Sequence, residues 1–100
     1  WGADYPDPSD YLAFLPGEIV GLRAGWSADA NPALSALADQ AATTIDTEAR
    51  GAIYEKIQEK MNVEGPFMPL FQTAQIAVTA KSLTGFVYNP TWTVDFAALK

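Results

Sequence analysis

The chain has 100 residues, of which 49% are hydrophobic, and its 12 acidic and 6 basic side chains give a net charge of −6. This composition excludes a disordered tail, and the acidic balance without a basic cluster argues against nucleic acid or an anionic membrane as a partner. Cysteine and histidine are absent, which excludes disulfides, thiolate or imidazole metal sites and a histidine general base.

The chain opens with a short segment that is rich in aromatic, acidic and proline residues, Trp1-Gly2-Ala3-Asp4-Tyr5-Pro6-Asp7-Pro8. Each proline fixes its own φ and biases the preceding residue toward extended geometry, so Tyr5 and Asp7 are not expected in a helix. We therefore predict a stiff loop that holds Trp1, Asp4 and Tyr5 in defined directions. Loops held by a scaffold often carry binding groups, which makes this loop the candidate site.

A short helix over residues 10–15 is predicted after the loop, with Ser9 as its N-cap and Pro16-Gly17 at its end. Residues 18–30 show no helical period and are predicted to be a loop. Trp26 stands alone in this stretch. An aromatic anchor that packs the loop onto the core is favoured over a second aromatic wall of a binding site.

Two helices are predicted in the middle of the chain, over residues 33–44 and 47–63. The first starts at Asn31-Pro32, because asparagine caps helices well and proline suits the first helical position. The second is capped by Asp46 or Thr47. The short connection between the two helices predicts an antiparallel or steeply angled pair.

The second predicted helix ends at Glu64-Gly65-Pro66, where the glycine is expected to adopt a positive φ and the proline prevents continuation. Each helix carries an apolar stripe that should face a core: Leu34, Leu37, Ala38 and Ala41 in the first, and Ala49, Ile53, Ile57 and Met61, flanked by Tyr54, in the second. Charged side chains of the second helix are expected to form a solvated face with weak pairs: Arg50, Glu55, Glu59 and Lys60.

The last third of the chain changes to a strand pattern. Short extended segments are predicted at residues 67–72, 74–79, 86–88 and 93–99, with a turn at residues 81–85. Pro69 makes the first of these an edge strand or an irregular one. Three side chains here are expected in the core, Phe67, Met68 and Phe71. The order of loop, helices and strands is typical of an α+β fold.

Four segments resemble, in order and spacing, the landmarks of one protein family. The opening segment resembles W-x-A-D-Y-P-D-P, and the start of the second long helix, from Asp46 through Arg50 to Tyr54, resembles D-x-x-x-R-x-x-x-Y. Residues 65–71 resemble P-x-x-P-L, and residues 81–90 resemble K-x-V-x-G-F…N-P. This ordered set resembles the extracytoplasmic solute-binding proteins of ABC importers, of the peptide, dipeptide and nickel type (family 5).

The resemblance implies an α+β fold that is the carboxyl-terminal part of one lobe of a two-lobe periplasmic-binding-protein-like fold. Residues 1–100 would then be a single fragment of a longer protein, with about residues 83–100 crossing back toward the other lobe. The implied function is substrate capture for ABC-transporter import, with short peptides favoured, by closure of two lobes around the ligand.

The implied partners are a small-molecule or peptide ligand, the ABC permease subunits and the remainder of the parent binding protein. The implied location is extracytoplasmic, in the periplasm or on the outer face of the cell membrane through a lipid anchor upstream. The resemblance implies no cofactor and no enzymatic activity.

The resemblance also assigns roles to the opening loop. Asp4 would receive the α-ammonium group of a peptide; the alternative is that it bonds to backbone amides of its own loop. Trp1 would line the cleft, or else pack in the core. Gly2 and Ala3 are small enough for their backbone to approach a ligand closely. Tyr5 either faces the cleft or packs beneath the loop.

Two other interpretations of the chain compete with ligand capture. One is a small structural or protein-interaction domain without a ligand of its own. The other is a hydrolase that uses Asp4 and Asp7 as paired carboxylates, but nothing in the sequence fixes those two side chains face to face. Asp7 is more simply a cap for the following helix. The chain has no nucleophile-elbow, phosphate-loop or metal-ligand motif, so the sequence favours a binding protein over an enzyme.

Overall fold

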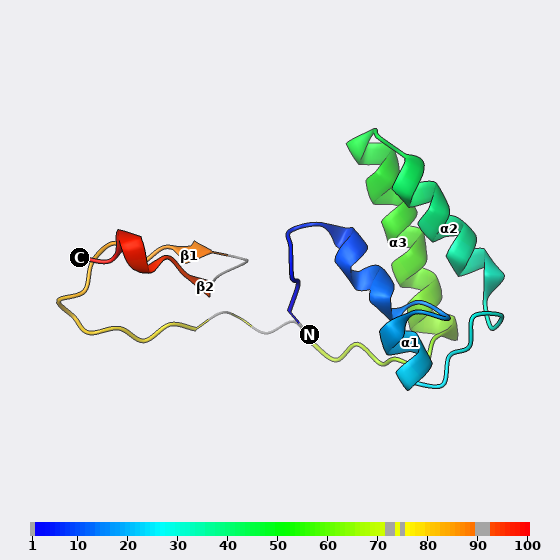
Figure 1. The fold of residues 1–100 in the computed structure, drawn as a ribbon, viewed down its shortest axis with the longest axis horizontal. Helices are drawn as coiled ribbons and strands as arrows, with labels where there is room; N and C mark the ends of the chain where they lie inside the picture. The colour runs from blue at the N-terminus through cyan, green and yellow to red at the C-terminus, as the bar shows by residue number, and fades with distance from the viewer. Residues whose placement is uncertain (1, 72–73, 75, 90–92) are drawn as a thin grey trace. The chain divides into compact units, whose positions relative to one another are not determined.

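The structure is a computed structural model that describes residues 2–71, 74, 76–89 and 93–100. The described residues fall into two compact units (Figure 1). The helical unit is Pro8–Pro69, and the extended unit takes the described residues of Trp1–Asp7 and Leu70–Lys100.

The helical unit begins with two short helices that pack on each other, the 3-10 helix η1 (Pro8–Phe14) and the α-helix α1 (Ile19–Arg23). The predicted cap Ser9 is wrong, since it lies inside η1, which starts one residue earlier at Pro8. Proline suits that first position because its missing N–H has no helical partner there.

The helix α1 contradicts the loop predicted for residues 18–30. Its apolar side chains give no helical period, and Ile19 and Leu22 are exposed. The helix packs on η1, and Gly21 lies so close to the end of η1 that a Cβ at this position would overlap the carbonyl oxygen of Leu15. The Gly21 carbonyl also accepts a hydrogen bond from the N–H of Trp26 at 2.9 Å. Tertiary contacts of this kind often stabilise helices too short to form alone.

The predicted helix pair is confirmed as α2 (Pro32–Thr43) and α3 (Thr47–Glu64). Figure 1 shows them side by side and antiparallel, joined by a short connection. Both predicted caps are present. The Asn31 side chain accepts from the N–H of Leu34 at 3.3 Å, and the Asp46 carboxylate accepts from the N–H of Ala49 at 2.8 Å.

The core of the helical unit lies between this helix pair and the segment that contains η1 and α1. Its buried side chains are Leu15, Trp26, Leu34, Ala41, Ile53, Tyr54 and Ile57, with Leu12, Leu37, Ala38, Met61 and Phe67 packed against them. Both predicted stripes therefore face the core, except at Ala49, which is exposed. Trp26 is 8% exposed and meets Phe67 edge to face at 6.3 Å, which confirms the loop anchor.

Gly65 ends α3 by a different geometry from the one predicted. Its φ is −85° and its ψ is 164°, so the expected positive φ is wrong. Extended geometry is what a residue before proline prefers, and Pro66 follows. Glycine is required here for space instead, because a Cβ would lie 2.5 Å from the Met61 carbonyl oxygen and 3.1 Å from the Trp26 ring.

Arg50 also departs from its predicted place on a solvated face. Its side chain is half-buried, with Nε donating to the Ala41 carbonyl oxygen at 3.3 Å and Nη2 donating to the Tyr54 hydroxyl at 3.1 Å. The carbonyls in the last turn of a helix lack helical partners. Arg50 therefore satisfies a carbonyl of α2 and joins the two helices near their connection.

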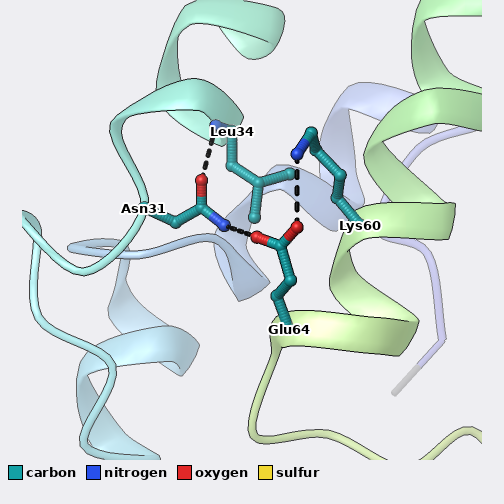
Figure 2. A network of polar contacts seen from close by, with 4 residues as sticks. All are labelled: Asn31, Leu34, Lys60 and Glu64. Atoms are coloured by element: carbon teal, nitrogen blue, oxygen red, sulfur yellow. Dashed lines mark hydrogen bonds and ion pairs between the residues drawn. The ribbon is translucent and has the colours of Figure 1, made fainter.

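At the end of the α2–α3 pair that lies away from their connection, a polar network joins the two helices (Figure 2). The Asn31 Nδ2 donates a hydrogen bond to Oε2 of Glu64, the last residue of α3, while the Asn31 Oδ1 caps α2. Lys60 Nζ lies 3.2 Å from Glu64 Oε1. One asparagine thus serves as the cap of one helix and as the link to the end of the other.

A substitution at Asn31 separates these two roles. Asn31→Asp keeps a capping oxygen but replaces the donor to Glu64 by a second carboxylate, and we expect a loss of about 1–2 kcal/mol in the free energy of unfolding at neutral pH. Adding Glu64→Gln supplies a new donor and should recover most of that loss. Urea unfolding followed by circular dichroism measures both variants. Equal losses in the single and double variants would contradict the link.

The extended unit contains a small antiparallel hairpin near the carboxyl end. Strand β1 (Tyr88–Asn89) pairs with β2 (Thr93–Val94), with Tyr88 opposite Val94. Farther from the connection, Thr84 and Lys100 exchange two backbone hydrogen bonds of 2.9 and 3.1 Å. The predicted turn before this hairpin is confirmed in part, since the N–H of Leu83 donates to the Ala80 carbonyl at 3.0 Å.

The other predicted strands are wrong for the residues that the structure describes. No strand forms between residues 67 and 79 there, and Met68 and Phe71, expected in the core, are 81% and 79% exposed. The predicted last strand is limited to β2, because the 3-10 helix η2 (Phe96–Ala98) follows it. Asp95 starts that helix by accepting from the N–H of Ala97 at 3.0 Å. The sequence supplies the strand pattern, but these segments have no partner strand within the described residues.

Candidate ligand-binding loop

The candidate loop, residues 2–7, is bent around Pro6. The N–H of Asp7 donates to the carbonyl oxygen of Tyr5 at 2.9 Å. A hydrogen bond between residues two apart is the pattern of a γ-turn, whose central residue needs a φ close to the value that proline imposes. The kink predicted from the proline pattern is therefore present.

The loop presents its polar side chains at the surface. Asp4 is exposed and Tyr5 is 46% exposed, while Ala3 and Asp7 are half-buried. Gly2 is exposed, and a Cβ there would meet nothing within 4 Å, but its approach to a ligand stays a prediction. Tyr5 is therefore not a core residue. Both alternatives for Asp4 stay predictions, because its exposure is compatible with either.

The predictions for Trp1 and Asp7, at the two ends of this segment, are both left untested by the structure. Trp1, predicted to line the cleft or to pack in the core, lies outside the described residues. Asp7 directly precedes Pro8, the first residue of η1, so it occupies the position of an N-cap. Its capping role stays a prediction.

The electrostatics of the loop are set by acidic residues. Residues 2–7 contain two carboxylates, Asp4 and Asp7, and no lysine or arginine. Such a segment attracts cationic groups and repels anions. Within the part of the chain that the structure describes, no cluster of three acidic, histidine or cysteine residues could hold a metal ion.

A buried carboxylate that follows the loop in the sequence was missed by the sequence analysis. Asp10, in the first turn of η1, is only 8% exposed. Carboxylates are seldom buried unless they have partners, so the burial of Asp10 within the helical unit is a feature that the sequence pattern did not reveal. The sequence feature that could have identified Asp10 is its position in the first turn of a helix, where negative charge is favourable.

The carboxyl of Asp29 differs from that of Asp10 because it is fully exposed, and a hydrogen bond from Ser27 holds its pKa below the ordinary value.

Comparison with known proteins finds two curated relatives. The chain is 28% identical over 91 residues to an Escherichia coli protein named "Probable deoxycholate-binding periplasmic protein YgiS", and the match covers 90% of the chain. It is 29% identical over 93 residues to the dipeptide-binding protein DppE of Bacillus subtilis, and that match covers 92% of the chain. The chain is similar to solute-binding proteins.

The similarity covers a small part of those relatives. The chain spans 16% of the length of each of them. No family model and no solved structure matches the chain. Among the helices in the described ranges, none is long and apolar enough to cross a membrane.

Proposed function

We propose that this chain is part of an extracytoplasmic solute-binding protein that captures a ligand for import by an ABC transporter. The observation that supports this most directly is the similarity to two binding proteins over nine-tenths of the chain. Neither relative is named as an enzyme, which fits the absence of a catalytic motif. The chain then forms the carboxyl-terminal part of one α+β lobe, and the rest of a longer protein supplies the other lobe.

The chemistry of the loop favours a peptide as the ligand. The two relatives are named for different ligands, deoxycholate and dipeptides. Deoxycholate is an anion, whereas a dipeptide carries an α-ammonium group. An acidic loop with an exposed Asp4 suits the ammonium group, because a charge-assisted hydrogen bond forms with the cation and repulsion meets the anion.

In this proposal the loop forms one wall of the ligand cleft, and the second lobe forms the opposite wall. Closure of the second lobe would exclude water from the cleft and strengthen the bond between Asp4 and the ammonium group. The closed form is stabilised only by the ligand's higher affinity for that form, and it is the state that would dock on the permease. Trp1, Gly2, Ala3 and Tyr5 would line the same wall of the cleft.

The test compares Asp4→Asn with the parent in the full-length protein, using calorimetry with a dipeptide. We expect the affinity to fall by about 30-fold or more, since truncating one partner of a desolvated charge pair costs about 2–5 kcal/mol. Asp39→Asn, which removes an exposed carboxylate from α2, is the matched control and should leave the affinity unchanged.

A second ligand form isolates the ammonium group. An N-acetylated dipeptide lacks the charge, so it should bind weakly to the parent and to Asp4→Asn alike. Equal dipeptide affinity in the parent and in Asp4→Asn would refute the role of Asp4. Binding of deoxycholate without binding of peptides would refute the peptide assignment and leave the solute-binding function in place.

A further inference from the structure

The segment that directly follows Asp4 has a strongly restricted backbone. Pro6 and Pro8 each fix their own φ, and each disfavours helical geometry at the residue before it, which is Tyr5 or Asp7. All of the residues from Tyr5 to Pro8 therefore have few backbone conformations open to them. Restrictions of this kind lower the conformational entropy of a segment before anything binds to it.

The bend at Pro6 is closed by one backbone hydrogen bond. The N–H of Asp7 donates to the Tyr5 carbonyl oxygen at 2.9 Å. The central residue of such a γ-turn needs a φ that the proline ring nearly imposes. Alanine or glycine at this position would reach the same φ as only one of several conformations, so proline is the residue that keeps the bend populated.

The population of the bend matters for a ligand that bonds to Asp4. Asp4 is joined to the bend through Tyr5, so the direction of its carboxylate depends on the conformation of both Tyr5 and Pro6. A ligand that needs one loop conformation binds with an apparent affinity reduced by the fraction of time that the loop spends in the others. A loop that is already bent avoids most of this loss.

We propose that Pro6 is a positioning residue, which holds the loop in the bend that presents the Asp4 carboxylate to the α-ammonium group of a peptide. This inference rests on the proposed function, because it concerns how Asp4 meets its ligand. Pro6 makes no contact with the ligand in this mechanism. It acts through Asp4, by raising the population of the conformation that binds.

The test measures dipeptide binding by calorimetry in the full-length protein, for the parent, Pro6→Ala and Pro6→Gly. Alanine can adopt the bend but does not enforce it, so we expect the affinity to fall by about two- to fivefold. Glycine has still more conformations open to it and should lower the affinity by about twofold more. Pro32→Ala, which removes the proline at the start of α2, is the matched control and should leave the affinity unchanged.

A double-mutant cycle separates positioning of Asp4 from a general effect on the cleft. In the Asp4→Asn background, Pro6→Ala should no longer change the affinity for the dipeptide, because the carboxylate that Pro6 positions is absent. In the parent background, Pro6→Ala should not change the affinity for the N-acetylated dipeptide, which has no ammonium group.

Two results would overturn this inference and leave the proposed function intact. In the first, Asp4→Asn weakens dipeptide binding but Pro6→Ala and Pro6→Gly do not. In the second, Pro6→Ala weakens binding by the same factor with and without the Asp4 carboxylate. Equal dipeptide affinity in the parent and in Asp4→Asn would instead refute the proposed role of Asp4, and this inference with it.

Discussion

Leu34→Ala is expected to lower the free energy of unfolding of the helical unit by about 2–5 kcal/mol, the range for removing a fully buried leucine side chain. Leu34 is 0% exposed and belongs to the core cluster in which α2 and α3 meet Leu15 and Trp26. Because Asn31 caps α2 on one side and the helix pair closes on the other, the backbone has little freedom to collapse into the space left behind. A unit of about sixty residues is stabilised by only about 3–9 kcal/mol in total, so the variant should be substantially unfolded at 25 °C.

Urea unfolding followed by the helical circular dichroism signal measures this loss. Leu22→Ala makes the same substitution in α1 at a side chain that is 56% exposed, and its effect should be within about 0.5 kcal/mol. If the two variants lose the same stability, Leu34 is not at the centre of the core.

Gly21→Ala is expected to destabilise the helical unit by about 1–3 kcal/mol, the usual cost of forcing extra atoms into a packed site. The sign is opposite to the normal effect of this substitution, because alanine favours helices over glycine by about 0.5–1 kcal/mol. At Gly21, however, the added Cβ would overlap the Leu15 carbonyl oxygen and lie 3.1 Å from that of Phe14. Both neighbours are backbone atoms, so η1 and α1 would have to separate.

Gly51→Ala in α3 is the matched control. A Cβ there would meet nothing within 4 Å, so the normal effect should appear as a gain of about 0.5–1 kcal/mol. Denaturation of the two variants under the same conditions should therefore give changes of opposite sign. Changes of the same sign would mean that α1 does not pack on η1 as the structure shows.

Local chemistry made the helix pair predictable. Asn31 and Asp46 are capping residues whose side chains can reach the free N–H groups of the first helical turn. Each capping hydrogen bond involves only a residue three positions later in the chain. The spacing of Leu34, Ala41, Ile53 and Ile57 likewise fixes which face of each helix avoids water, whatever the rest of the fold is. The bend at Pro6 follows from the proline ring in the same way.

Contacts between residues distant in sequence decided what the patterns did not. Gly65 was expected to provide a positive φ, but it provides space beside Trp26, which lies far earlier in the chain. Arg50 was expected in solvent, but the carbonyl at Ala41 lacked a helical partner and lay within its reach. The strands expected between residues 67 and 79 needed a partner strand, and β-propensity alone does not provide one.

The sequence by itself determined the helix pair, its two caps, the bend of the candidate loop and the acidic character of that loop. Each of these depends on φ restrictions, on side chains within one helical turn or on charge counts, all of which are local. The tertiary structure alone decided the formation of α1, the place of Arg50, the tie between Asn31 and Glu64, and the exposure of Met68 and Phe71. Those features depend on which distant groups meet, because burial and backbone hydrogen bonding are satisfied by the whole chain and not by any one segment.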